Sequence, residues 1–127
     1  MSPDLVVRRA LWASVVFNLF GALMFAFPDT LAGRIAGLPP DVPALYRALL
    51  VVFVLLFAGT YAWLARAPHI DRPMLALGAI GKAAAFGTVA LVWLAGAAPA
   101  RSLVPMSGDL GFAALFAWWL MLDARRA

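Results

Sequence analysis

The chain has 127 residues, of which 65% are apolar and only 13% are charged, and its formal net charge is +4. The charged share is half of the roughly 25% found in soluble domains, so the composition excludes a disordered chain and argues against a soluble globular fold. The length excludes a multidomain enzyme. We therefore expect an integral membrane protein.

Four segments are apolar enough to cross a hydrocarbon core of ~30 Å, which takes about 20 residues of helix. They lie at about residues 10–27, 43–65, 73–95 and 106–122. The first span could be confused with a signal peptide, but its apolar run is long and no clear cleavage site follows it. We therefore expect a retained helix, and a single transmembrane domain over residues 1–127.

Basic residues near the spans predict how the chain is oriented. Two arginines, Arg34 and Arg101, belong to one side, and Arg47 lies just inside the second span. The other side has six: Arg8, Arg9, Arg66, Arg72, Arg125 and Arg126. Because basic residues are enriched in cytoplasmic loops, both termini are predicted to be cytoplasmic. Short connections favour an all-α, up-down-up-down four-helix bundle.

The first loop carries the signals of a small additional helix. Asp29 is a candidate N-cap, Leu31 and Ile35 share one face, and Gly37 is suited to end the helix. We expect this segment to lie at the membrane interface.

Two polar residues fall close to the middle of the membrane. By helical rise, Asn18 lies roughly 15 Å into the first span and Lys82 roughly 14 Å into the third. An ionisable group at this depth is costly and indicates a functional site. Asp109 is the one acidic residue expected inside a span, but its axial distance from Lys82 is on the order of 12 Å by the same rise. Lys82 is therefore predicted to lack an intrachain carboxylate at its level.

Three alternatives follow for Lys82. It is neutral because desolvation disfavours the charged form, it is held charged by Asn18, hydroxyls, carbonyls and water, or it meets an anion or a polar head from outside the chain. A purely structural alternative is that Lys82 reaches towards the cytoplasm or bonds to Asn18 and only fixes packing.

Further polar groups share the faces of these two residues. Ser14 lies one helical turn before Asn18 on the first span, while Thr60 and Tyr61 are placed to line the inner half of the second. The candidate ligand-binding residues are therefore Lys82, Asn18, Ser14, Tyr61 and Thr60. Arg47 and Asp109 enter their spans from the same side, and we expect them to form a salt bridge near the outer surface.

The chain also resembles the small four-helix bacterial membrane proteins of the DoxX-like group. The residues behind the resemblance are Arg9, Ala10 and Leu11 before a first helix containing Gly21, the stop at Pro28, and Gly81 with Lys82 in the third span. The resemblance implies an up-down bundle in a bacterial inner membrane and, for some members, association with quinone-linked or redox partners. It assigns no functional residue to this chain.

Catalysis and bound cofactors find little support in the composition. The chain has no cysteine and one histidine, His69, which lies in a polar turn, so neither a metal centre nor a Ser/His/Asp set is expected. Our leading hypothesis is a non-enzymatic protein whose polar intramembrane pocket binds or passes a small anionic or amphipathic molecule. The alternative is an accessory or scaffold subunit of a larger, redox-linked membrane complex, and a third is an enzyme acting on lipid or quinone. Membrane lipid, such a ligand and further copies or subunits are the expected partners; nucleic acid is not.

Overall fold

The computed structural model describes residues 1–127 and contains helices but no strands. Four long helices, α1 (Pro3–Ala26), α3 (Ala44–Arg66), α4 (Arg72–Leu94) and α5 (Leu103–Arg126), are joined by a short helix, α2 (Leu31–Ile35), and a 3-10 turn, η1 (Ala100–Ser102). All four long helices are long and apolar enough to cross a membrane. The all-helical prediction with four candidate spans is confirmed.

Local sequence explains where the long helices start. Ser2 caps α1 by accepting a hydrogen bond from the Leu5 amide, and Asp71 caps α4 by accepting one from Met74 at 2.8 Å. Because Ser2 is the cap, α1 begins well before the first apolar residue of its span. At the other end of the chain, α5 begins directly after η1, about one turn earlier than the span predicted from residue 106.

The predicted helix in the first loop is present as α2, with a different cap. The Thr30 hydroxyl, rather than Asp29, accepts a hydrogen bond from the Gly33 amide. Gly37 follows α2 with φ +72°, and Gly96 follows α4 with φ +78°. This left-handed conformation is open to glycine at little cost and is common just past a helix C-terminus.

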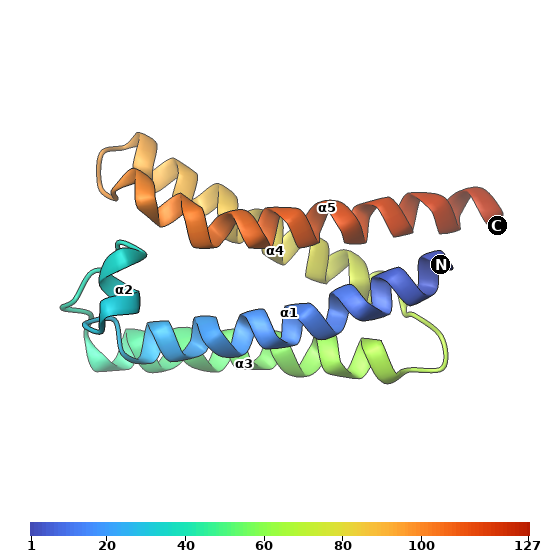
Figure 1. Ribbon diagram of the computed structural model, residues 1–127, viewed down its shortest axis with the longest axis horizontal. Coiled ribbons are helices and arrows are strands. Elements are labelled where there is room, and N and C mark those ends of the chain that lie inside the picture. Colours follow the sequence, from blue (N-terminus) through green and yellow to red (C-terminus); the bar gives the residue numbers. More distant parts are fainter.

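The long helices form two pairs that meet along part of their length. Helix α1 packs along α3 and α4 packs along α5, whereas contacts between the pairs are fewer. Figure 1 shows both chain termini at one end of the molecule, here called the terminal end, and α2 at the opposite end, here called the α2 end. The two pairs diverge towards the α2 end (Figure 1).

The terminal end holds the tightly packed core. Its fully buried members include Val7 and Leu11 of α1, Leu75 of α4 and Phe116 of α5. In contrast, large apolar side chains on the outward faces of all four long helices are exposed. An apolar exterior around a small core is what a lipid environment allows.

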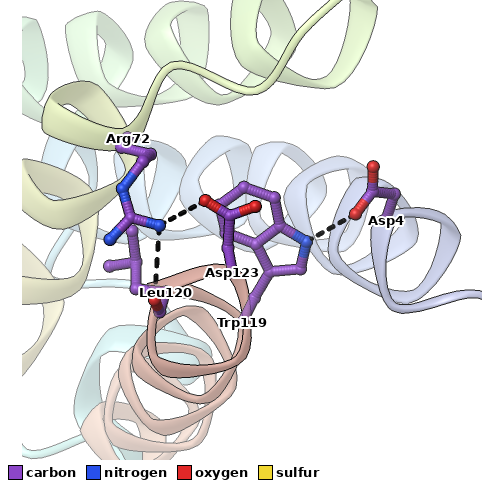
Figure 2. A network of polar contacts seen from close by, with 5 residues as sticks. All are labelled: Asp4, Arg72, Trp119, Leu120 and Asp123. Atoms are coloured by element: carbon purple, nitrogen blue, oxygen red, sulfur yellow. Dashed lines mark hydrogen bonds and ion pairs between the residues drawn. The ribbon is translucent and has the colours of Figure 1, made fainter. Parts of the chain in front are cut away.

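Polar contacts join the helices at the terminal end. The Trp119 indole of α5 donates to the Asp4 carboxylate of α1 at 2.8 Å, and Arg72 of α4 pairs with Asp123 of α5 (Figure 2). Arg8 of α1 donates to the carbonyl oxygens of Ala65, Ala67 and Pro68 at the end of α3. The hydrogen bonds from Arg8 thus satisfy carbonyl oxygens at and just after the C-terminus of α3, where the helix itself supplies no partner.

Candidate binding site

A buried ion pair joins α4 to α5 inside the bundle. The Lys82 Nζ lies 2.7 Å from Asp109 Oδ1, and the two side chains are only 3% and 11% exposed. The pair is therefore nearly dry and carries no net charge when both groups are ionised. Removing either partner would leave a buried charge uncompensated.

Asn18 extends the ion pair to α1 and α3. Its Oδ1 accepts a hydrogen bond from Lys82 Nζ at 3.2 Å, and its Nδ2 donates to the Val54 carbonyl at 3.1 Å. The side-chain amide thus connects the α4/α5 pair to the α1/α3 pair. The sequence-based grouping of Asn18 with Lys82 is present in the structure.

Three aromatic rings surround the lysine ammonium group. The rings of Phe17, Tyr61 and Phe112 each have their centroid 5.0 Å from Lys82 Nζ. A cation over a ring face at this distance gains about 0.5–2 kcal/mol, more where water is excluded. The rings therefore stabilise the ammonium form and shield it from solvent.

Two glycines give these rings the space they occupy. A Cβ on Gly108 of α5 would lie 2.6 Å from the Phe17 ring, and a Cβ on Gly78 of α4 would lie 2.9 Å from the Tyr61 ring. Both distances are too short for a real side chain without rearrangement. The small residues thus let the rings of one helix pair reach the backbone of the other.

A cavity of about 580 Å³ extends from the ion pair towards the α2 end. Phe17, Tyr61, Lys82 and Asp109 line its deep part. The four long helices and the segment that follows α2 contribute to the rest of the wall, through residues such as Phe20, Met24, Leu38, Phe53, Ala85, Val89 and Met106. The volume falls within the range of pockets that hold small ligands, which is about 300–1,000 Å³.

The structure overturns the prediction that Lys82 lacks a carboxylate partner. Because α5 begins at Leu103, Asp109 lies about 9 Å from the start of its helix, while Lys82 lies about 18 Å from the end of α4. The remaining offset of about 9 Å is spanned by the long lysine side chain and the carboxylate. The later helix start assumed from hydropathy placed Asp109 too close to the surface.

The predicted salt bridge between Arg47 and Asp109 is also wrong. Asp109 pairs with Lys82, and the Arg47 side chain makes no ion pair or hydrogen bond. The reason is helix pairing: α5 packs along α4, whereas Arg47 belongs to α3, which packs along α1. Equal depth from one surface did not place the two residues side by side.

The other candidate residues separate into two groups. Tyr61 lines the deep part of the cavity beside Lys82. Ser14 is fully buried, but its hydroxyl has no hydrogen-bond partner and it does not line the cavity. Thr60 donates to the Leu56 carbonyl of its own helix, an ordinary intrahelical bond, and is also absent from the cavity wall.

Sequence reasoning missed two of the three rings around Lys82, those of Phe17 and Phe112. Phe17 directly precedes Asn18, and Phe112 lies three residues after Asp109, so each shares the helical neighbourhood of a polar site residue. Aromatic residues are common throughout the spans, and this spacing became informative only once the partner of Lys82 was known.

Comparisons with protein-family models, curated proteins and solved structures found no match to this chain. The DoxX-like resemblance stays a prediction.

Proposed function

We propose that this chain is a multi-pass membrane protein that binds, or passes, a small amphipathic molecule in the cavity between its two helix pairs. The apolar walls take the molecule's body, and its polar head lies at the ion pair. Lys82, Asp109, Asn18 and Tyr61 are the residues that contact the head. No catalytic role is assigned to them.

One observation carries this proposal: a cavity of about 580 Å³ has apolar walls and a cluster of buried polar groups at its deep end. Pockets that hold small ligands share this composition, in which apolar surface gives affinity and a few polar groups fix orientation. Because Asp109 offsets the charge of Lys82, an amphipathic ligand is favoured over a simple anion.

The position of Lys82 bears on the alternative of an accessory or scaffold subunit in a redox-linked membrane complex. In that role, Lys82 would contact a partner helix from the outside of the bundle. The residue is instead buried among α1, α4 and α5 and lines the cavity. Binding within the chain is therefore the better-supported use of this lysine, and the bundle remains free to form oligomers through its outer faces.

The proposed setting is a bacterial inner membrane, crossed up-down-up-down with both termini cytoplasmic. The excess of arginines on the predicted cytoplasmic side supports this orientation, and the shared end of the two termini supports their lying on the same side (Figure 1). The chain has no cysteine, so single cysteines report topology without background. A membrane-impermeant maleimide should label Ala98→Cys in intact cells and Ala127→Cys only after lysis; the reverse pattern would invert the orientation.

A matched pair of variants tests the cavity itself. Ala85 lines the cavity, while its neighbour Ala84 is exposed on the outside of the same helix. Dodecanol, dodecanoate and dodecylamine are offered separately to the purified protein, and bound molecules are counted by native mass spectrometry from a mild detergent. At least one probe should bind the wild type and Ala84→Phe and be lost in Ala85→Phe. Equal binding by all three proteins, or no binding of any probe, would reject the cavity as a binding site.

A further inference from the structure

The hydrogen bonds of the ion pair point to the kind of head group that the cavity accepts. We infer that the ligand carries an uncharged hydroxyl head, which donates to Asp109 and accepts from Tyr61 or Lys82. This inference rests on the proposed function, since it concerns the head of a molecule held in that cavity.

The charge balance of the deep end excludes a charged head. Lys82 and Asp109 lie 2.7 Å apart and offset each other, and no other ionisable side chain except Tyr61 lines the cavity. An anionic head would meet the Asp109 carboxylate, and a cationic head would meet the Lys82 ammonium. Either head would bring an uncompensated charge into an apolar environment, which is costly.

The unused hydrogen-bonding capacity distinguishes a hydroxyl from neutral heads that can only accept a hydrogen bond. Asp109 uses Oδ1 to accept from Lys82, and no group of the chain donates to its Oδ2. The Tyr61 hydroxyl forms no hydrogen bond within the chain, and Lys82 Nζ donates to only two oxygens although an ammonium has three N–H groups. The site therefore offers one strong acceptor beside spare donors. A hydroxyl satisfies both, whereas an ether or ester oxygen only accepts.

The surroundings of the pair support selection by the head rather than by the tail. Beyond Tyr61 the wall is formed largely by apolar side chains such as Phe53, Met24 and Val89, which contact an alkyl chain through apolar surface and form no hydrogen bond with it. Discrimination by a buried hydrogen-bonding group is much stronger than discrimination by one methylene. We therefore expect this cavity to select its ligand by the chemical class of the head.

Four probes of equal chain length test the inference in nanodiscs of a neutral phospholipid in mildly alkaline buffer. Retention of radiolabelled dodecanol is measured for the wild type, with binding to Ala85→Phe subtracted, and unlabelled dodecanoate, dodecylamine and dodecyl methyl ether compete for the site. Dodecanol should bind at least about tenfold more tightly than either charged probe. It should bind about tenfold more tightly than the methyl ether, which cannot donate to a carboxylate. Dodecanoate or dodecylamine competing as well as dodecanol would overturn the uncharged head while leaving the cavity in place. An equally strong methyl ether would overturn the hydroxyl.

Two variants then reverse the preference by unbalancing the pair. Asp109→Asn leaves the Lys82 ammonium without a countercharge, so dodecanoate should become the tightest probe. Lys82→Met leaves the Asp109 carboxylate, so dodecylamine should become the tightest. An unchanged order of probes in a folded variant would refute the role of the pair in selecting the head. If neither variant folds, the ranking of the four probes by the wild type decides the inference alone.

Discussion

Replacing Lys82 with methionine removes the ammonium group but keeps an unbranched side chain of similar bulk, so packing changes little. The loss is electrostatic. At an effective dielectric of ~20, two unit charges about 3 Å apart attract by roughly 5 kcal/mol, and the substitution leaves the Asp109 carboxylate buried at 11% side-chain exposure. Breaking a buried pair from one side typically costs about 3–5 kcal/mol. We expect Lys82→Met to lower the free energy of unfolding by about 3 kcal/mol.

Asp109→Leu makes the complementary change and should cost a similar amount, because it leaves the lysine without its carboxylate. The double variant has neither charge and should be no less stable than either single variant, since apolar replacement of a buried pair is often neutral or stabilising. The double-mutant cycle therefore predicts a coupling energy of about 3 kcal/mol, at the upper end for residues in contact.

The assay is equilibrium unfolding in mixed micelles with a rising fraction of sodium dodecyl sulfate, followed by helical circular dichroism. Arg72 and Asp123 provide the matched control, because this ion pair is exposed by 43% and 37% at its side chains. The cycle of Arg72→Met and Asp123→Leu should give a coupling energy below about 1 kcal/mol. Additive losses at Lys82 and Asp109, or equal coupling in both cycles, would refute the argument that burial makes the inner pair strong.

Two further pairs of variants, each a test and its matched control, probe helix contacts outside the ion pair by the same unfolding assay. Gly108→Ala should lower the free energy of unfolding by about 1–3 kcal/mol, because its Cβ would lie 2.6 Å from the Phe17 ring. The control Gly111→Ala, whose Cβ would have no atom within 4 Å, should be neutral or slightly stabilising. Equal effects of the two substitutions would show that the Phe17 ring moves freely. Arg8→Ala should lower the free energy of unfolding by about 2 kcal/mol, because three carbonyl oxygens lose a charged donor. The control Arg9→Ala should change it by no more than about 0.5 kcal/mol. A loss at Arg9 as large as that at Arg8 would contradict the assigned contacts.

Hydropathy was sufficient to predict the four long helices, because a span of about 20 apolar residues is a strong one-dimensional signal. Local capping and turn signals predicted α2 and the glycine that follows it, because an N-cap and a left-handed glycine each act within a few residues of the helix end. It named Thr30's neighbour Asp29 as the cap, an error of one residue that follows from two adjacent residues with capping side chains.

The site was predicted only in part, because its geometry depends on which helices are paired. Lys82, Asn18 and Tyr61 were identified, since a polar residue inside a span must face the interior. The sequence did not identify the partner of Asp109, because it gives the depth of each residue in its span but neither the rotation of the helix nor the helix beside it. A helix start that differed by one turn changed the apparent distance between Lys82 and Asp109 enough to hide their pairing.

The positions of the two ion pairs point to different roles, one in holding the helices together and the other in binding a ligand. At the terminal end, Arg72 pairs with Asp123 where water can reach both, and the Trp119 indole donates to Asp4 nearby (Figure 2). Those contacts already join α4 and α1 to α5. A second polar link between α4 and α5 deep in the bundle adds the desolvation cost of two buried charges and is not needed to hold the helices together. Apolar replacement of a buried ion pair is often neutral or stabilising, so holding α4 against α5 does not require Lys82 and Asp109. A buried pair at the deep end of a cavity is therefore best explained by the molecule that enters that cavity, and the change of preferred probe expected for Asp109→Asn tests this directly.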